Sequence, residues 1–574
     1  MTENNNHIIK KRWTVSPLIP AHISRELAEF SPFMRQLLFN RGIDTAEIAR
    51  AYVSQDSPTN PDPFALKDMD KVVDMIHDAL QENQKIAIYG DYDTDGVTSS
   101  ALLYEFFTQI GSDARVYIPN RFDEGYGLNK EAIQQLAAEG VNLIITVDCG
   151  IRAIDEVALA KSLGMHVIVS DHHLPGKQVP EADAIIDPHQ PGDPYPYKML
   201  AGVGIAYKIA LAYLKKYPQP QIDPRQWLDL VSIGTVVDIA PLDGENRALV
   251  KAGLQVLRST QRQGLYSLIQ TAGIKIEKIN ASHLGFGIGP RLNAAGRMDS
   301  ALAAFELLTT QDLFRAGSLA QQLDNYNSQR KDIMHAIQEK VVTEASAADP
   351  DIPIVISFSE EYEEGVVGLA AGRVAESFYK PAIVGRLEDG MVKASCRTIP
   401  EFNIVEALEL CDDLLDHYGG HAMAAGLGMA VDQIENFTER IIQIARERLA
   451  GIELAPELFI DYEISLDKLK PEHIPGILSD IAQLEPTGSN NPDALFCSRN
   501  CKVTRAYAVG DGRHLKLTLG AGFHQFDAIA FNQGHWMQNL PEYVDVAYTF
   551  EINDYQGRQS LQLNIKDIKV SEAA

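Results

Sequence analysis

The chain has 574 residues, of which 45% are hydrophobic and 22% are charged. This length is too great for one hydrophobic core and predicts about three to five domains, at roughly 100–200 residues each. The chain contains 78 Asp and Glu against 51 Lys and Arg, which gives a formal net charge of −27. Such a charge excludes a protein that coats nucleic acid through overall positive charge, but it allows a local binding groove or carboxylates that hold cations.

Cysteine usage and hydropathy indicate the compartment. Five cysteines without a Cys-x-x-Cys pair argue against a disulfide framework and an all-cysteine zinc site, and they favour a reducing environment. No apolar run approaches the ~20 residues of a membrane span, and the N-terminal MTENNNHIIKKRW lacks the apolar core of a signal peptide. We therefore expect a cytoplasmic protein that does not enter a membrane.

The first half of the chain predicts a helical segment followed by a parallel sheet. Residues 1–80 are expected to be mostly helical and carry no motif. Over residues 81–323, short apolar runs alternate with helical segments, which is typical of a parallel sheet with helices on both faces. The expected strands are KIAIY, RVYI, LIITV, HVIVS and AIID, at residues 85–89, 115–118, 143–147, 166–170 and 184–187.

The second half predicts two further domains. A long polar helix is expected at residues 324–345, leading into a second α/β domain at 346–452. Residues 453–574 contain five short strand-like runs with a turn at Asp511-Gly512, which predicts a small barrel of the oligonucleotide-binding (OB) kind. The expected fold class is therefore α/β, with a parallel-sheet domain, a second α/β domain joined by a long helix, and a C-terminal OB-like β-barrel.

Acidic residues follow the expected strands of the parallel sheet. Because ligands bind at the carboxyl ends of parallel strands, these residues should converge at one edge. An EF-hand calcium loop is excluded because Leu102 stands where its last acidic ligand would be. An Asx turn that caps the following helix remains an alternative for the DxDxDG run. The residues concerned are Asp91, Asp93 and Asp95 after the first strand, Asp148 after the third, Asp171, His172 and His173 after the fourth, and Asp187 at the end of the fifth.

This concentration of carboxylates favours a metal site. Three like charges in one loop repel one another unless cations neutralise them, and oxygen ligands suit hard divalent metals. His172 adds an imidazole, a mixture that suits Mn²⁺ or Mg²⁺, with Mn²⁺ the more tolerant of histidine. Asp238 in GTVVDIAPL could add a further carboxylate, although a helix N-cap explains it equally well.

The motifs DYDTDG, VDCG, SDHH and GTVVDIAPL, in this order and at these separations, resemble those of the DHH phosphoesterase superfamily. GGH at 419–421 resembles its associated C-terminal domain. The segment GIGPRLNAAGRM at 287–298, the long helix and the barrel are similar to the superfamily's single-strand-specific DNA exonucleases. The resemblance covers nearly the whole chain from about Lys85, without departure at the metal positions.

The resemblance implies an enzyme that hydrolyses single-stranded DNA from the 5′ end to mononucleotides, with a role in DNA repair and recombination. The alternative function is that of a phosphoesterase of the same superfamily that acts on oligoribonucleotides or small phosphorylated substrates. An enzyme for such small substrates would not need a separate binding domain. A catalytically silent DNA-binding scaffold is disfavoured because every metal-ligating residue is present. The resemblance also implies a single-strand-binding protein and a RecQ-like helicase as partners, and a monomeric enzyme.

The resemblance further implies two divalent cations, Mn²⁺ or Mg²⁺, bridged by Asp148. His173 would contact the scissile phosphate or protonate the leaving group, and Asp171 would orient an imidazole. The implied ligands are Asp93 and Asp148, with Asp91 beside them, for one cation, and Asp95, Asp148, His172 and Asp238 for the other.

Further polar residues are expected to hold DNA or its 5′ phosphate, since arginine forks match phosphate oxygens. A solvated surface is the alternative for any single arginine. The residues are Arg121, Arg291, Asn293, Arg297, Arg373, Ser395, Arg397 and His421.

In the barrel, a basic cluster with Tyr507 and Phe523 as stacking surfaces favours single-strand binding, although a basic hairpin face with core aromatics is equally compatible. That cluster consists of Arg499, Lys502, Arg505, Arg513 and Lys516.

Overall fold

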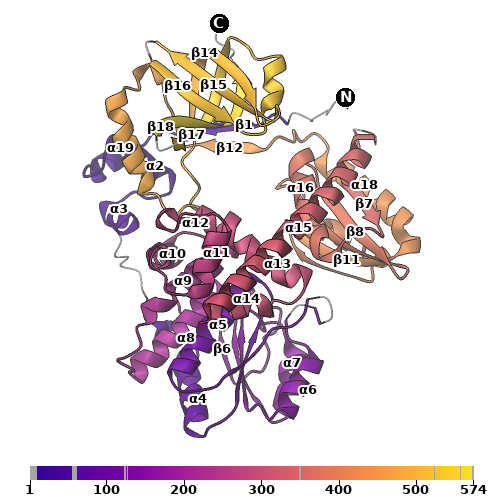
Figure 1. Cartoon of the computed structure of the whole chain (residues 1–574). Coiled ribbons are helices and arrows are strands. Elements are labelled where there is room, and N and C mark those ends of the chain that lie inside the picture. Colours follow the sequence, from indigo (N-terminus) through magenta and orange to yellow (C-terminus); the bar gives the residue numbers. More distant parts are fainter. Residues whose placement is uncertain are drawn as a thin grey trace. The chain divides into compact units, whose positions relative to one another are not determined.

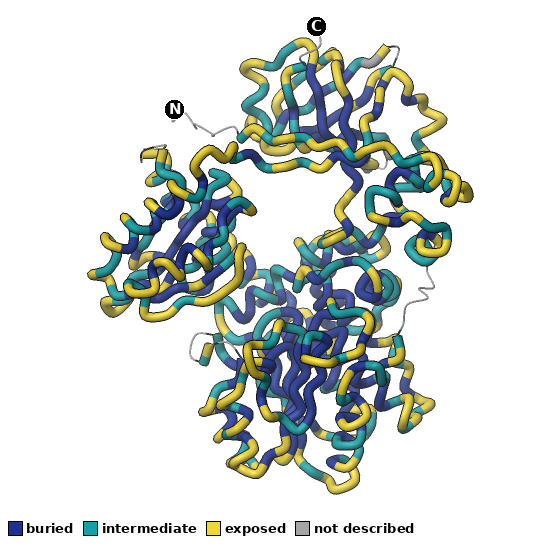
Figure 2. Tube along the Cα trace, turned by 180° about the vertical axis from the view of Figure 1, so that it is seen from behind, coloured by how far each residue is buried: buried dark blue, intermediate teal, exposed yellow. Residues whose placement is uncertain are grey.

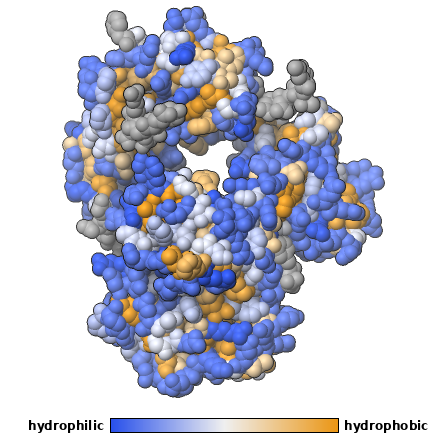
Figure 3. All heavy atoms as spheres, viewed as in Figure 1, coloured by the Kyte–Doolittle hydropathy of each residue, from blue (hydrophilic) through white to orange (hydrophobic). Residues whose placement is uncertain are grey.

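The chain forms two compact units in a computed structural model. One unit comprises residues 61–240 and 252–456, and the other comprises residues 11–60, 241–251 and 457–574. No helix among the described residues is long and apolar enough to cross a bilayer. Hydrophilic residues predominate on the face drawn in Figure 3, with apolar residues between them. The structure describes residues 9–54, 61–121, 124–125, 127–347, 349, 351–522, 524–555 and 558–571.

A five-stranded parallel sheet is the centre of the first unit. Its order is β3-β2-β4-β5-β6, and all five strands expected from the sequence form. The central strands are buried along most of their length (Figure 2), as their continuous apolar runs require. The strands are β2 (Ile86–Gly90), β3 (Arg115–Tyr117), β4 (Leu143–Val147), β5 (His166–Ser170) and β6 (Ala184–Ile186).

Helices cover both faces of this sheet (Figure 1). Alternate residues of the strands, such as Tyr89, Ile144 and Val167, form one core with the helices α6 and α7. The opposite face packs against α4, α5 and α8. The helices are α4 (Met69–Gln81), α5 (Thr94–Gln109), α6 (Lys130–Ala138), α7 (Ile154–Ser162) and α8 (Gly202–Lys216).

A helical region follows and ends in the long helix α15 (Leu313–Ala347). This helix begins at Leu313 rather than near Asp324, because Asp312 accepts hydrogen bonds from the N–H groups of Phe314 and Arg315 and caps it. Its first turns are buried against α11, α13 and α14. The preceding elements are α9 (Leu228–Val237), α10 (Gly244–Leu257), α11 (Gln263–Thr271), α12 (Ala281–His283), the π-helix η4 (Leu284–Ile288), α13 (Gly289–Met298) and α14 (Leu302–Thr309).

The second α/β domain of this unit has a mixed sheet with the order β10-β11-β9-β8-β7, in which only β7 and β8 are parallel. Its core is formed on one face with α16 and α15, and on the other with α17 and α18. Its elements are β7 (Val355–Ser359), α16 (Glu364–Phe378), β8 (Ala382–Glu388), β9 (Met391–Arg397), α17 (Ile404–Glu409), β10 (His417–His421), β11 (Ala424–Ala430) and α18 (Ile434–Leu449).

The second unit contains the expected barrel. Strand β14 pairs with both β15 and β17, which closes the order β14-β15-β16-β18-β17 into a ring of five strands. The strands are β14 (Phe496–Val509), β15 (His514–Ala521), β16 (His524–Ala530), β17 (Tyr543–Tyr555) and β18 (Arg558–Val570), with β13 (Tyr462–Glu463) added at β14.

Residues 11–54 belong to the barrel's unit, which the sequence did not indicate. Leu37 and Leu38 share a core with Phe496 and Leu517 of the barrel, and the ring of Phe33 stacks on that of Phe496 at 5.4 Å. The segment also contains a strand in what was expected to be helix. Its elements are β1 (Arg12–Val15), paired in parallel with β12 (Glu457–Ile460), and the helices α1 (Ala21–Glu26), α2 (Pro32–Asn40) and α3 (Ala46–Val53), beside α19 (Ile474–Ala482).

Candidate active site

The loop after β2 holds the first three carboxylates. Asp93 is the N-cap of α5, and its Oδ1 accepts hydrogen bonds from the N–H groups of Asp95 (2.9 Å) and Gly96 (3.1 Å). The Asx turn that stood as an alternative is therefore present, and it occupies only one oxygen of this side chain. Asp91 is buried immediately after the strand, and the Asp95 carboxylate accepts the N–H group of Gly202 at 2.7 Å.

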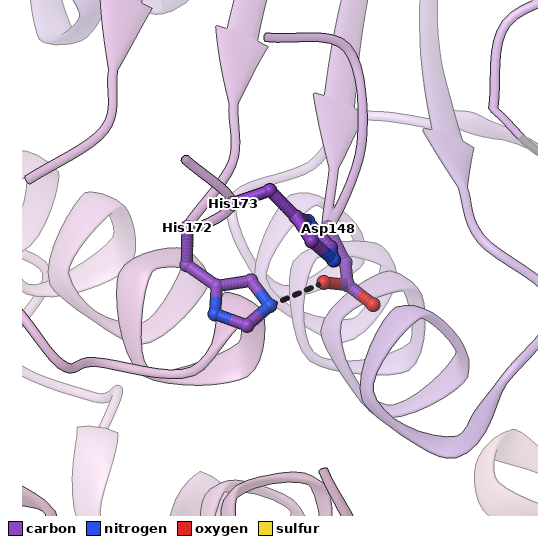
Figure 4. A group of neighbouring side chains, drawn as sticks. All are labelled: Asp148, His172 and His173. Carbon is purple, nitrogen blue, oxygen red and sulfur yellow. Dashed lines mark ion pairs between the residues drawn. The ribbon is translucent and has the colours of Figure 1, made fainter. Parts of the chain in front are cut away.

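Asp148 lies at the centre of the group. Its backbone has a φ of 62°, a left-handed conformation that Asp tolerates better than most residues. Its Oδ1 lies 3.0 Å from Nε2 of His172 (Figure 4). A Cβ atom on Gly202 would lie 2.8 Å from Cβ of Asp148, so the glycine at the start of α8 is needed for this close approach.

Asp238 joins the group from α9. Its Oδ2 lies 3.8 Å from Nε2 of His172. The N-cap interpretation of Asp238 is wrong, because the residue is the C-cap of α9, which ends at Val237. A carboxylate at the negative end of a helix dipole is unfavourable, so this position makes a neighbouring cation more important.

Three overlapping groups of side chains place their ligand atoms within 4.8 Å of one another. Asp148 belongs to two of them and His172 to two, which is the overlap expected of two adjacent cations. The groups are Asp91 with Asp93 and Asp148, Asp95 with His172 and Asp238, and Asp148 with His172 and His173.

The polar atoms of this group fit divalent cations. Within the described part of the chain, Oδ1 of Asp91 is buried without a hydrogen-bond partner. Oδ1 of Asp148 and Nε2 of His172 are 3.0 Å apart but not in hydrogen-bond geometry, and they have no other hydrogen-bond partner there. Such a state is costly unless a ligand satisfies the atoms. Burial, and then neighbouring carboxylates, raise the pKa of Asp95 to about 7 and that of Asp238 to about 9. Burial lowers the pKa of His172 to about 4, so its imidazole is neutral, which is the form that binds metals.

Asp171 orients His173. Its Oδ1 lies 2.7 Å from Nδ1 of His173, and its Oδ2 accepts the N–H group of Ile151 at 2.9 Å. Burial opposes protonation of His173, but the hydrogen bond to Asp171 and the nearby carboxylates outweigh it and raise the pKa to about 9. The imidazole therefore carries a proton near neutral pH.

Arginines from five segments gather in the same unit. Burial, then the charges of Arg121 and Arg330, lower the pKa of Arg297 to about 10, and burial and then Arg121 lower that of Arg397. Arg121 also lies over the ring of Tyr92, at 5.3 Å from its centroid. Tyr92 is in the loop after β2. That loop carries three carboxylates of the metal group, by which we mean Asp91, Asp93, Asp95, Asp148, His172, His173 and Asp238. We call this set the guanidinium cluster; it consists of Arg121, Arg297, Arg330, Arg373 and Arg397.

The sequence did not identify Arg330, which lies on α15. Its Nη2 donates to Oδ1 of Asn327 at 2.9 Å, and its Nε is buried with no hydrogen-bond partner among the described residues. Burial and then Arg373 lower its pKa. The signal in the sequence was the polar pair Asn327 and Arg330, spaced three residues apart on a helix. Such pairs are common on helix surfaces.

The other predicted phosphate-binding residues of the second α/β domain differ in how they are held. Gly368 makes room for two of them, since a Cβ atom there would lie 3.1 Å from Nη2 of Arg397 and 3.3 Å from Oγ of Ser395. Arg373 is more loosely placed, with an exposed ion pair to Glu376 at 3.0 Å. His421 is exposed on the strand β10 at the edge of the sheet.

Arg291 and Asn293 are occupied by structural contacts. Arg291 donates to Asp324 at 2.9 Å and thereby joins α13 to α15. Asn293 accepts from the backbone N–H and the hydroxyl of Thr94, both at 2.8 Å, and so holds the metal-binding loop. Their contact with DNA stays a prediction.

Small residues allow α13 to approach the loop that follows β2. A Cβ atom on Gly296 would lie 2.7 Å from the carbonyl oxygen of Tyr92, closer than real side chains come to a backbone atom. The next residue, Arg297, donates to the carbonyl oxygen of Gly365 at 3.3 Å, so α13 also contacts the second α/β domain.

On the barrel, the structure divides the predicted basic cluster. Arg499 pairs with Asp545 at 3.0 Å and Lys502 with Glu542 at 3.1 Å, so their charges are largely balanced. Tyr507 is opposite Lys516 in the register of β14 and β15, and the Arg505 guanidinium lies 5.3 Å from the Tyr507 ring. These three residues form the basic aromatic face of the barrel. Phe523 lies outside the described residues.

The parallel sheet, with carboxylates and two histidines at its carboxyl edge, defines a phosphoesterase of the DHH class. Residues 85–235 match the DHH family, N-terminal domain, and residues 351–447 match the DHHA1 domain. Residues 460–567 match the RecJ OB domain. The chain belongs to the RecJ family of single-stranded-DNA-specific exonucleases, as the ordered motifs predicted.

Relatives and solved structures cover nearly the whole chain. The RecJ exonuclease of Bacillus subtilis (strain 168) is 36% identical over 95% of this chain and 69% of its own. That of Escherichia coli (strain K12) is 36% identical over 94% and 96%. Crystal structures of RecJ from Thermus thermophilus in complex with Mn²⁺ and with Mg²⁺ superpose with TM-scores of 0.85 and 0.79, at 30% and 28% identity. Each match covers 98% of this chain. It covers 80% of the chain in the Mn²⁺ complex and 79% of the chain in the Mg²⁺ complex.

Proposed function

We propose that the protein is a metal-dependent exonuclease that hydrolyses single-stranded DNA from the 5′ end and releases mononucleotides. The observation that carries this proposal is the metal group, which consists of three overlapping sets of ligand atoms. Asp148 belongs to two of these sets, and His172 belongs to two. Several of those atoms are buried and make no hydrogen bond among the described residues. Membership of a family whose curated relatives are named single-stranded-DNA-specific exonucleases supports it.

The ligand atoms fit Mn²⁺ or Mg²⁺ in the arrangement that the sequence implied. Asp93 and Asp148, with Asp91, would hold one cation, and Asp95, Asp148, His172 and Asp238 would hold the other. When bound, such a pair polarises the phosphoryl group and lowers the pKa of a nearby water.

His173 is the protein's own proton donor at this site. Its Nδ1 is held by Asp171 at 2.7 Å, which fixes the direction of the ring. Its Nε2 can then donate to a phosphate oxygen or to the leaving oxygen of the scissile bond. The raised pKa of His173 keeps that proton in place at neutral pH.

The guanidinium cluster supports 5′ polarity. Arg121, Arg373, Ser395 and Arg397 are proposed to bind the terminal 5′ phosphate, and mutually repelling guanidinium groups favour a bound anion. A phosphate held at this cluster would set the direction of digestion. Its distance from the metal group would set the length of the product.

The decisive experiment uses 5′-labelled single-stranded DNA, single-stranded RNA and duplex DNA, each with and without Mn²⁺. We expect release of labelled mononucleotide from single-stranded DNA only when the metal is present. Digestion from the 3′ end, or equal rates on duplex DNA, would contradict the proposal. Cleavage of short oligoribonucleotides in preference to DNA would favour the small-substrate alternative.

The basic aromatic face of the barrel favours a polymeric substrate over that alternative. Among the described residues, Arg505 and Lys516 form no ion pair with a carboxylate, and Tyr507 is 41% exposed beside them. Replacing Arg505 and Lys516 by Ala should remove about two phosphate contacts. The slope of log DNA affinity against log salt concentration should therefore become shallower by about two. Cleavage of a very short oligonucleotide should be unchanged. A slope that does not change would remove the barrel from the proposal.

Family membership also supports proposals on the protein's setting. These are a role in DNA repair and recombination, cooperation with a single-strand-binding protein and a RecQ-like helicase, a monomeric state and a cytoplasmic location. Light scattering of the purified full-length chain tests the monomer, since a dimer would double the mass. Co-purification with each candidate partner, with and without single-stranded DNA, tests the interactions.

A further inference from the structure

The residue after Asp238 has a backbone conformation that its side chain disfavours. The N–H group of Ile239 donates to the carbonyl of Val236, and that of Ala240 to the carbonyl of Thr235, both at 3.2 Å. These two bonds end α9 in a Schellman motif, which puts Ile239 at the left-handed position with a φ of 61°. Glycine is the usual residue there, and a β-branched side chain is a genuine outlier.

Ile239 is an exception even among the left-handed residues of the described chain. Of ten non-glycine residues with positive φ, eight are Asn or Asp, and Ile239 alone is β-branched. Packing does not explain it, because its side chain is 73% exposed whereas the following Ala240 is buried. Backbone strain that packing does not explain is typical of functional positions.

Ile239 directly follows Asp238, a partly exposed carboxylate of the metal group. The exposed fraction of the side chains rises from 0% for Asp95 and 3% for Asp148 to 24% for Asp238. Asp238 is therefore more accessible to solvent than Asp95 or Asp148, and Ile239 is the next residue in the chain, about 3.8 Å away between Cα atoms.

The neighbouring segment adds a second exposed apolar side chain. The π-helix η4 packs against the end of α9, where Cγ1 of Val236 would lie 3.7 Å from a Cβ atom on Gly285. The next residue of that segment, Phe286, is 81% exposed. π-Helical turns are frequent at functional sites.

We propose that Ile239 contacts the substrate and packs against the base of the nucleotide whose phosphodiester bond is at the metal group. This inference rests on the proposed function. Phosphate and sugar present polar atoms, whereas every base has an apolar face that an aliphatic side chain can cover without reading sequence. Such a contact would position the nucleotide for cleavage, and it explains why isoleucine stands where glycine would relieve strain.

The test compares Ile239→Gly and Ile239→Val in the full-length protein on two oligonucleotides, one normal and one abasic at its 5′-terminal positions. We expect Ile239→Gly to raise the melting temperature by a few degrees, because the strain is relieved. It should also lower kcat/KM on normal DNA about 5- to 20-fold through loss of the apolar contact. On abasic DNA it should match the wild type, and Ile239→Val should retain activity on both substrates.

Asp389→Gly is the matched control, because Asp389 is also left-handed, with a φ of 50°, and lies in the exposed turn between β8 and β9. It should change stability without changing kinetics. Equal losses for Ile239→Gly on normal and abasic DNA would overturn the proposal, since they would indicate displacement of Asp238. No loss on normal DNA, or a lower melting temperature, would also overturn it.

A binding measurement separates this inference from the proposed function. Fluorescence anisotropy without metal should show weaker binding of normal DNA by Ile239→Gly, and unchanged binding of abasic DNA. If the wild type degraded no single-stranded DNA with Mn²⁺, the proposed function would be wrong, and the anisotropy result would still decide whether Ile239 contacts a base. Equal anisotropy for wild type and variant on normal DNA would overturn the contact.

Discussion

The metal group and the guanidinium cluster are both sets of like charges in one unit, but the sequence indicates them very unequally. Most carboxylates of the metal group follow strands of one parallel sheet, and the carboxyl ends of such strands meet at one edge. The arginines come from a loop, three helices and a strand of another sheet. Convergence is therefore built into the topology of the first set, whereas for the second set it depends on how separate elements pack.

The comparison also shows how each cluster indicates its ligand. Crowded carboxylates have raised pKa values, and crowded guanidinium groups have lowered ones. In both cases burial and like charge disfavour the ionised form, and an oppositely charged ligand removes the penalty. The proposed binding of cations at one cluster and of phosphate at the other would suit an enzyme for phosphodiester bonds.

The largest expected effect concerns Asp148. Asp148→Asn keeps a residue that tolerates the left-handed φ of 62°, but it removes the charge that we propose to bridge two cations. Loss of groups that only support metal ligands already lowers activity 10–100-fold, so we expect a loss of more than about a thousandfold here. DNA cleavage in Mn²⁺ and DNA affinity by anisotropy are the measurements, and affinity should change little.

Metal binding to the same variant provides the control. At a cation concentration of about 100 times Kd, the wild type should gain roughly 2.7 kcal/mol of stability, which calorimetry detects as a higher melting temperature. Asp148→Asn should gain much less. A variant that keeps more than a few per cent of the activity, or the full metal-dependent stabilisation, would show that Asp148 does not bridge the cations.

The same contrast explains how far the sequence could predict the fold. Strands such as Leu143–Val147 and His166–Ser170 were predicted because continuous apolar runs have no alternative but burial. The start of α15 at Leu313 was missed although its cap, Asp312, is local. The strand at Arg12–Val15 was not predicted, because it depends on pairing with Glu457–Ile460, far away in the sequence. Arg330 was missed for the same reason.

His173 tests whether the metal group needs a proton donor of its own. His173→Gln keeps a side chain of similar length but cannot carry a proton between groups, and a general acid contributes about 10²–10⁴-fold. We expect a loss near the lower end of that range, mainly in kcat, because the metal ligands remain. Steady-state kinetics on single-stranded DNA measure it, and a change confined to KM would indicate that His173 only binds the phosphate.

The guanidinium cluster should respond to the chemistry of the DNA end. Arg397→Ala removes a charge-assisted contact of about 1.5–3 kcal/mol, so activity on 5′-phosphorylated ends should fall roughly ten- to a hundredfold. The loss should be smaller on 5′-hydroxyl ends. Arg373→Ala is the matched comparison and should lose less, since its guanidinium is exposed and paired with Glu376. Equal losses on both kinds of end would assign Arg397 to folding or to general backbone binding.

The smallest effect, on Arg330, gives the sharpest test because two measurements should move in opposite directions. Arg330→Gln removes a guanidinium whose Nε is buried without a hydrogen-bond partner among the described residues and whose pKa is lowered by burial and by Arg373. The free protein should therefore become slightly more stable, while activity on 5′-phosphorylated DNA falls about three- to tenfold through the loss of roughly 1 kcal/mol of attraction. Inorganic phosphate should raise the melting temperature of the wild type more than that of the variant. If the variant melted at a lower temperature and bound phosphate as well as the wild type, Arg330 would be a structural residue, and the guanidinium cluster would end at the four arginines that the sequence indicated.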